Sequence, residues 1–350
     1  MKILAVGPVF ADSFAHNVVV TLQAMRHRVV SAAGLRFRHN GNRYLNAFWR
    51  QLDAGFPAVE LSYFHGLLRQ ARKFQPELVL VTHDRVPPQV VAKLKQACSG
   101  KVVCWFTDPV IMLYRHYLVG APYDAVFLKE PFLVRVFTQK LGVQAHYLPE
   151  CCNPMWHKRV SLTEEDRARY GCDLAALGTL HYYRARMLET FAHYDLKIWG
   201  RSAPPYVETT VRRKYMHDFV TCERKAKAFS AAKIVVNTTL YAEIEGVNCT
   251  LFEAAGCGAC QIAEWKPALP QLFEPEREIV TYRTGQELKE KVDYYLAHPQ
   301  ERAEVSERAH ARAQREHTYE LRFKRMFEIL GFTTGACGPA EKVNASRRQR

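Results

Sequence analysis

Two glutamates, Glu245 and Glu253, are separated by seven residues and lie on either side of a predicted helix start. Between them, Asn248 is the predicted N-cap, because an asparagine side chain accepts hydrogen bonds from the free amides of a first helical turn. Gly246 permits unusual backbone dihedrals or the close approach of another group. The free amides and the dipole of such a helix start bind anions, so we expect a diphosphate there.

Glu253 falls in the second turn of this predicted helix. Its neighbours are all apolar: Leu251, Phe252, Ala254 and Ala255. A carboxylate in such surroundings is paired, bound to a ligand or costly to bury. We favour a ligand, because one carboxylate can accept hydrogen bonds from both hydroxyls of a ribose. Glu245 would then lie at the diphosphate end of the same ligand.

The chain around this motif alternates between short apolar runs and helical patterns. The predicted strands are 2–6, 78–81, 102–106, 125–128, 145–148, 174–177, 196–199 and 234–237. The predicted helices are 17–25, 88–97, 131–140, 186–192, 225–231, 249–255, 287–297, 301–312 and 319–330. Such alternation is typical of parallel sheets covered by helices. We therefore predict an α/β protein with two Rossmann-like domains that face each other across a cleft.

The length of 350 residues also favours two domains, because it exceeds what one hydrophobic core usually holds. The predicted N-terminal domain, 1–150, would bind the acceptor. A linker at 151–170 leads to a donor domain at 171–332, whose final helix crosses back to the first domain. Residues 333–350 lose periodicity and are expected to form a flexible basic tail.

Ligands of parallel sheets bind beyond the carboxyl ends of the strands. In the first domain this rule points to His83 and Asp84 after one predicted strand and to Asp108 after another. His83 and Asp84 could supply a base on the acceptor side. Asp108 could touch a substrate, although Thr107-Asp108-Pro109 also suits a turn.

Several other chemistries lack their motifs. No G-x-G-x-x-G follows a strand and no P-loop is present, which disfavours a dehydrogenase and excludes P-loop chemistry. Cys257 and Cys260 have C-x-x-C spacing, but no second pair accompanies them, and Asp84 and Asp108 are isolated. We therefore expect neither a metal site nor a cofactor. The first residues run into a glycine turn without a signal-peptide pattern, so a cytoplasmic location is expected.

The composition is basic, with 49 Lys and Arg against 35 Asp and Glu and a formal net charge of +14. Residues 1–150 hold 18 of these basic residues and 9 of the acidic ones. Such a balance suggests an anionic partner. No nucleic-acid-binding signature accompanies it, so no specific nucleic acid is expected. An anionic acceptor, or a membrane surface that presents it, fits the charge of the first domain better.

The segment from Glu245 to Gly258 resembles the E-x7-E region of GT-B glycosyltransferases. Most of residues 75–330 is similar to one branch, the spore-maturation, CgeB-type glycosyltransferase-like proteins. The matching pieces include Trp105–Asp108, Tyr147–Pro149, Leu177–Gly178, Ile198–Gly200, Glu253–Gly258, Pro270–Pro275 and Tyr294–Pro299.

This resemblance implies a role for several residues of the second domain. Glu253 would hold the nucleotide ribose, and Glu245 would lie near the donor sugar or its phosphates. Arg184 would neutralise the leaving nucleoside diphosphate, with Arg186 as the alternative on the same helix. Further donor-binding candidates are Gly178, Gly200, Arg201, Gly246, Asn248 and Thr250.

The implied activity is transfer of a sugar from a nucleoside-diphosphate sugar to an acceptor. The acceptor would be an anionic surface or envelope glycan, a lipid-linked molecule or a protein. The enzyme would meet this acceptor in the cytoplasm, either at the inner face of the membrane or away from it. The E-x7-E pattern resembles that of retaining enzymes. Two alternatives remain open, namely a sugar-nucleotide epimerase and a nucleotide-sugar-binding protein without turnover.

Overall fold

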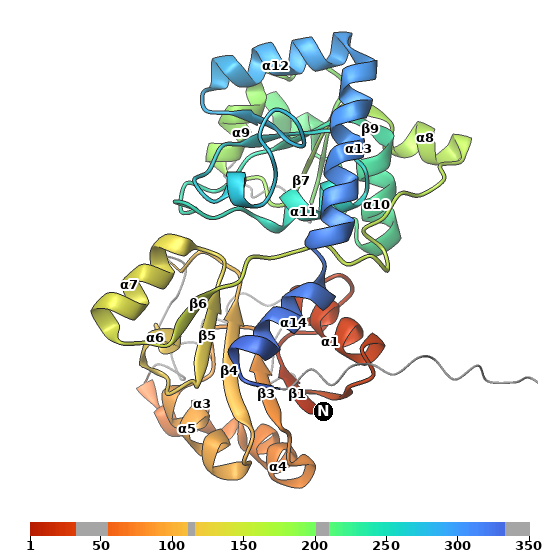
Figure 1. Ribbon diagram of the computed structural model, residues 1–350. Helices are drawn as coiled ribbons and strands as arrows, with labels where there is room; N and C mark the ends of the chain where they lie inside the picture. The colour runs from red at the N-terminus through yellow and green to blue at the C-terminus, as the bar shows by residue number, and fades with distance from the viewer. Residues whose placement is uncertain (33–54, 111–115, 201–209, 333–350) are drawn as a thin grey trace, which may run out of the picture.

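The computed structural model describes residues 1–32, 55–110, 116–200 and 210–332 and contains two α/β domains (Figure 1). A sheet with strand order β2-β1-β3-β4-β5-β6 forms the first domain, and one with order β11-β10-β9-β7-β8 forms the second. All strand pairs are parallel. The predicted fold class is confirmed.

The elements of the first domain precede the segment that joins the two sheets. Its strands are β1 (Lys2–Val6), β2 (Arg28–Ala32), β3 (Leu78–Val81), β4 (Lys101–Phe106), β5 (Ala125–Leu128) and β6 (Ala145–Tyr147). Its helices are α1 (Phe14–Ala24), α3 (Pro57–Ser62), α4 (His65–Phe74), α5 (Pro88–Ala97), α6 (Tyr117–Gly120) and α7 (Pro131–Leu141).

The second domain repeats this pattern. Its strands are β7 (Cys172–Leu177), β8 (Leu196–Trp199), β9 (Ala232–Asn237), β10 (Gln261–Glu264) and β11 (Val280–Tyr282). The helices are α8 (Glu164–Tyr170), α9 (Tyr182–Glu189), α10 (Cys222–Ala231), α11 (Cys249–Gly256), α12 (Gly285–Ala297), α13 (Pro299–Glu316) and α14 (Tyr319–Ile329), with short 3-10 turns η2 (Thr210–Lys214) and η3 (Leu269–Gln271).

Both sheets share one strand order, in which the first strand of the domain lies between the second and the third. In the first sheet β1 pairs with β2 and β3, and in the second β7 pairs with β8 and β9. The strand order reverses at this first strand, and ligands of such sheets bind beyond the carboxyl end of the strand at that point, a position that we call the crevice of the sheet. Topology alone therefore marks the ends of β1 and β3, and of β7 and β9, as ligand positions.

The sequence patterns missed three strands, namely the edge strands β2 and β11 and strand β10, which lies between β11 and β9. These strands have five, four and three residues for β2, β10 and β11. In β2 only the last residue is buried, so the strand carries no continuous buried apolar run. Part of the predicted linker is also ordered, because α8 lies within it and Cys152 and Asn153 are buried.

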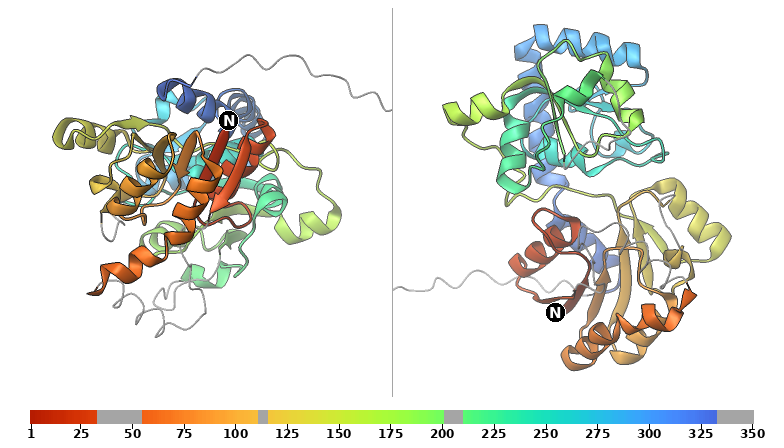
Figure 2. Two further views of the ribbon diagram at one scale, coloured as in Figure 1. Left: turned by 90° about the horizontal axis from the view of Figure 1, so that it is seen from below. Right: turned by 180° about the vertical axis from the view of Figure 1, so that it is seen from behind.

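The last helix, α14, packs against the sheet of the first domain (Figures 1 and 2). Its buried side chains, Tyr319, Phe323 and Phe327, join a cluster with residues of β1, β3 and β4. The Phe323 ring meets that of the fully buried Trp105 edge-on, with centroids 5.7 Å apart. Helix α14 therefore follows the second domain in sequence but packs on the first.

Some sequence predictions fall outside the described residues. These are the basic tail at 333–350, the candidate Arg201 and five basic residues of the first domain: Arg36, Arg38, Arg43, Arg50 and Arg115. Within the part of the chain that is described, no helix combines the length and the apolar sequence of a membrane span.

We expect Phe323→Ala to lower the free energy of unfolding by about 3–5 kcal/mol, because it leaves a cavity among fully buried side chains. Lys324→Ala on the same helix is the matched control. Its ammonium pairs with Glu320 at the surface, and its loss should cost about 0.5 kcal/mol or less. Urea unfolding of both variants measures the difference. Equal losses would mean that α14 does not pack on the first domain in solution.

Candidate functional site

The crevice of the second sheet begins at Gly178, directly after β7. Gly178 has a φ of +116°, in the region that favours glycine, and a Cβ there would lie 2.7 Å from Nη1 of Arg184. At the end of the neighbouring strand β8, a Cβ on Gly200 would clash with the hydroxyl of Tyr215. Both glycines thus allow close approach at the carboxyl end of the sheet.

Arg184 joins the ends of the two strands that border this crevice. Its Nη1 donates to the carbonyl oxygen of Leu177 at 2.7 Å, and its Nε donates to Oγ1 of Thr238 at 2.8 Å. Burial lowers the pKa of the guanidinium, which still remains charged at neutral pH. Among the described residues no carboxylate pairs with it. A cation held in place without a counter-charge is well suited to bind an anion.

The start of α11 lies beside this crevice and has the predicted cap. Asn248 is the N-cap, and its Oδ1 accepts from the Leu251 amide at 3.2 Å. Its Nδ2 donates to Oδ1 of Asn237 at the end of β9, at 2.8 Å. Thr250 is buried in the first turn of the helix. The cap prediction is confirmed, and the Asn237–Asn248 pair fixes the helix start to the sheet.

Glu253 is buried in α11, as its apolar flanks predict, and it is paired with a cation. The Nζ of Lys225, on α10, lies 3.1 Å from Oε1 of Glu253 and 2.6 Å from Oδ2 of Asp12. Asp12 belongs to the loop between β1 and α1 of the first domain. The carboxylate that we assigned to a ligand is therefore also part of an ion-pair network between the domains.

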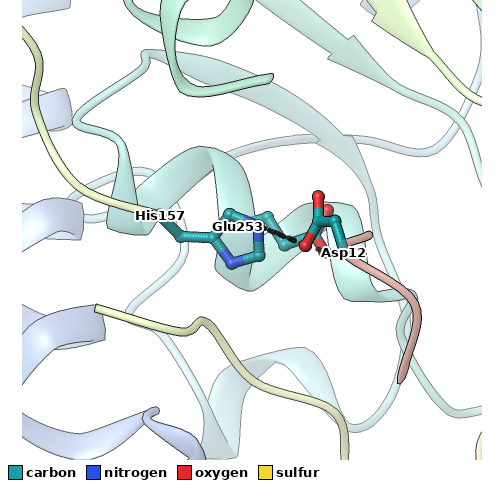
Figure 3. Close-up of side chains that lie close together, drawn as sticks. All are labelled: Asp12, His157 and Glu253. Carbon is teal, nitrogen blue, oxygen red and sulfur yellow. Dashed lines mark ion pairs between the residues drawn. The ribbon is translucent and has the colours of Figure 1, made fainter. Parts of the chain in front are cut away.

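His157 completes this group of side chains (Figure 3). Its Nε2 lies 3.3 Å from Oδ1 of Asp12 and 3.7 Å from Oε1 of Glu253, an arrangement that resembles a set of metal ligands. The residues do not fit a cation, however. The Nδ1 of His157 accepts from the amide of Asn153 at 3.0 Å, so the ring proton is on Nε2. Lys225 already supplies a positive charge.

A second contact between the domains covers the loop before α11. The carboxylate of Glu130, the N-cap of α7, accepts from three successive amides, those of Ile244, Glu245 and Gly246, at 3.0, 2.9 and 3.0 Å. A Cβ on Gly246 would lie 2.6 Å from the carbonyl oxygen of Lys129. The glycine is therefore needed for close approach, which is one of the two roles that the sequence suggested.

The side chain of Glu245 takes part in the same contact. Both of its carboxylate oxygens accept from the guanidinium of Arg135 on α7, at 2.9 and 2.6 Å. This bidentate pairing lowers the pKa of Glu245. Glu245 is thus ionised and held by the first domain in this structure.

Next to Glu130 in sequence, the buried side chain of Lys129 lies close to two buried carboxyl groups. Its Nζ lies 3.0 Å from Oε1 of Glu243 and 3.5 Å from Oε2 of Glu150. Burial disfavours the charge on Lys129, but the two carboxylates outweigh it and raise the pKa of the ammonium. Burial raises the pKa of Glu150 to about 8, and Lys129 offsets only part of this effect.

The acceptor-side candidates lie at the ends of neighbouring strands, β3 and β4. Burial lowers the pKa of His83 to about 3, and its Nδ1 accepts from the amide of Arg85 at 3.0 Å. The ring is therefore a weak proton acceptor, which does not support the predicted role of His83 as a base. Asp84 is half-buried, and burial raises the pKa of its carboxyl. Asp108 is exposed.

One donor-site candidate is not brought to the others. Arg186 is on the exposed face of α9, where its Nη1 pairs with Glu189 at 2.6 Å. It points to solvent because it lies two residues from Arg184 on the same helix. Of the two arginines, the structure favours Arg184.

Sequence reasoning missed many of the residues that pair across the domains, among them Asp12, Lys129, Glu130, Arg135, His157, Lys225 and Glu243. Asp12 follows the glycine turn after β1, whose carboxyl end the sheet topology marks as a ligand position. The apolar neighbours of Glu253 were a signal that a cation could pair with it. Lys225 lies on another helix, however, and no local spacing identifies it.

Three comparisons with known proteins agree with this geometry. Residues 184–328, which run from within α9 to within α14, match the family model described as "Glycosyl transferase-like". Spore protein CgeB of Bacillus subtilis is 24% identical over 261 residues, which are 68% of this chain and 78% of CgeB.

Solved structures extend the likeness to the whole fold. Sucrose-phosphate synthase from Thermosynechococcus elongatus matches with a TM-score of 0.67 and 14% identity, over 95% of this chain and 98% of that one. Anabaena HepE in complex with UDP matches with a TM-score of 0.65 and 14% identity, over 95% and 100%. The chain thus has the GT-B fold and resembles CgeB, as the sequence motifs indicated.

The buried carboxyl of Glu150 should make stability depend on pH. The folded protein holds a proton that the unfolded chain releases near pH 4.5, so the contribution of Glu150 to stability falls as the pH rises from 4.5 to about 8. The free energy of unfolding of the wild type, minus that of Glu150→Gln, should therefore decrease between about pH 5.5 and about pH 8.5. Urea titrations at several pH values measure this.

The matched control for this experiment is Glu307→Gln. The exposed Glu307 pairs with Arg159, which lowers the pKa of its carboxyl, so its contribution does not change in that pH window. Parallel pH profiles for wild type and Glu150→Gln would contradict a raised pKa at Glu150.

Proposed function

We propose that this protein transfers a sugar from a nucleoside-diphosphate sugar, bound in the crevice of the second domain, to an acceptor bound by the first. One observation carries the proposal: Arg184, free of any described carboxylate, lies where β7 and β9 end, beside the capped start of α11. Its class as a glycosyltransferase rests on the matched family model and the GT-B fold. HepE is described in complexes with UDP and with UDP-glucose, which supports a nucleotide-sugar donor.

The donor would lie along the carboxyl ends of the strands of the second sheet. Arg184 and the first-turn amides of α11 would bind the diphosphate, with Gly178 and Gly200 allowing it close to the backbone. The ribose would reach Glu253 further along the helix. Glu245 would lie near the donor sugar, once it is released from Arg135.

The transfer would need no strong base from the first domain. The acceptor hydroxyl attacks the anomeric carbon, the bond from that carbon to the phosphate oxygen breaks, and the leaving diphosphate takes the acceptor proton. Arg184 would stabilise the negative charge that grows on the leaving group. The low pKa of His83 supports this course, which leads to retention of configuration. Asp84 and Asp108 remain the candidates for acceptor contacts.

For the acceptor we propose an anionic glycan, a lipid-linked molecule or a protein in surface or envelope glycan synthesis. The basic excess of residues 1–150 supports an anionic acceptor and contact with a membrane surface that presents it. We further propose that the protein works in the cytoplasm and needs no metal or other cofactor.

A nucleotide-sugar-binding protein without turnover is the second candidate. Two contacts between the domains favour it. Glu130 binds the amides of the loop before α11, and Arg135 binds the carboxylate of Glu245. Release of nucleoside diphosphate from a bound donor, with or without acceptor, distinguishes the two: a silent binder would release none.

The donor site can be tested with Glu253→Gln, which keeps the size of the side chain and removes its charge. UDP-, GDP- and dTDP-sugars are screened by thermal shift, followed by calorimetric titration of those that bind. We expect at least one nucleotide sugar to stabilise the wild type and to bind the variant at least about tenfold more weakly, as for loss of a charged hydrogen bond.

Glu307→Gln again serves as the control, because this exposed carboxylate lies on α13 and pairs with Arg159. It should bind the same nucleotide sugar as the wild type does. If no nucleotide sugar binds the wild type, or if Glu253→Gln binds equally well, the donor site is not where we propose.

A further inference from the structure

Figure 3 shows Asp12 and His157 beside Glu253, and Lys225 pairs with the same carboxylate; these three neighbours of Glu253 have no part in the function proposed so far. Asp12, His157 and Lys225 surround Glu253 and come from the first domain, the connecting segment and α10. They do not fit a metal site, as the hydrogen bond to Nδ1 of His157 shows. Their arrangement around a ribose-binding candidate therefore needs another explanation.

Lys225 engages only one oxygen of the Glu253 carboxylate. Its Nζ lies 3.1 Å from Oε1, and of the described residues none donates a hydrogen bond to Oε2. A carboxylate oxygen has two acceptor positions, so Lys225 leaves one on Oε1 and both on Oε2. The carboxylate could still accept hydrogen bonds from two ribose hydroxyls while Lys225 fixes its orientation.

Lys225 is in turn held by Asp12. The side chain of Asp12 is 1% exposed, and its Oδ2 lies 2.6 Å from Nζ of Lys225. Both carboxylate oxygens accept further bonds, Oδ1 from Trp156 Nε1 and Asn17 Nδ2 and Oδ2 from the Cys222 amide. Although burial would raise the pKa of Asp12, His157 and Lys225 lower it overall. Asp12 is a fixed negative charge that orients the ammonium.

We propose that Lys225, anchored by Asp12, is a positioning residue that orients the Glu253 carboxylate toward the ribose hydroxyls of the donor nucleotide. The first domain then takes part in donor recognition, although the donor binds to the second. This inference rests on the proposed function, since it assigns the ribose to Glu253.

The test compares nucleotides with and without ribose hydroxyls. UDP and GDP are titrated calorimetrically into wild type and Lys225→Met, each beside its 2′,3′-dideoxy analogue. In the wild type, loss of the hydroxyls should weaken the binding nucleotide about tenfold or more. In Lys225→Met this factor should fall to near one, because the carboxylate is no longer oriented. Affinity for the dideoxy analogue should match that of the wild type.

Three further variants separate positioning from a general structural role. Lys225→Arg keeps a cation beside Glu253 and should restore most of the discrimination between the two nucleotides. Asp12→Asn removes the anchor charge and should reduce the discrimination as Lys225→Met does. Lys227→Met is the matched control on the same helix, where Lys227 pairs with Asp166, and it should discriminate like the wild type.

Each possible outcome of these titrations supports or contradicts the positioning role of Lys225. If Lys225→Met and Asp12→Asn keep the full discrimination, the positioning role is wrong while the proposed donor site stands. An equal loss of affinity for both nucleotides would mean that Lys225 only stabilises the fold, which also overturns the inference. If the wild type binds no nucleoside diphosphate, or binds without regard to the ribose hydroxyls, the ribose assignment to Glu253 falls, and this inference falls with it.

Discussion

The structure depends on one electrostatic constraint, the burial of the Glu253 carboxylate in an apolar helix. A buried carboxylate without a partner costs several kcal/mol or takes up a proton, so it requires a cation nearby. Lys225 supplies this cation, and its own burial requires a second carboxylate, that of Asp12. Because Asp12 belongs to the other domain, balancing the charge of one helix ties the two domains together.

A second set of buried charges follows the same logic. Lys129 of the first domain lies between Glu150 and Glu243, and the Glu130 carboxylate is satisfied by the amides of the loop before α11. The carboxyl ends of both sheets thus meet through polar and charged groups that pair between the two domains. Topology explains why they meet there, since the shared strand order puts a crevice at the end of β1 and of β7.

The sequence predicted those features that depend on local patterns. Buried strands such as β3 and β5 are continuous apolar runs, and Asn248 could be identified as a cap because its role needs only the next three residues. Glu253 was conspicuous because its neighbours are apolar. The edge strands β2 and β11 were missed because only one residue of β2 is buried and β11 has three residues.

The partners of the charged residues could not be predicted in this way. Lys225 and Asp12 are far from Glu253 in sequence, and only the packing of α10 and of the first loop brings them to it. Likewise, the choice between Arg184 and Arg186 depends on which face of α9 is turned to the sheet. The pKa of His83 was also beyond local reasoning, since it follows from burial by the folded chain.

The central claim is that the crevice of the second domain binds the nucleotide sugar. Amide hydrogen exchange, followed by mass spectrometry with and without a saturating UDP-, GDP- or dTDP-sugar, tests it most directly. The account predicts slower exchange in peptides that cover residues 178–186 and 247–253, with the first domain changing least at its outer helices α4 and α5. Protection confined to the first domain, or the absence of any protection by a nucleotide sugar that binds, would contradict it.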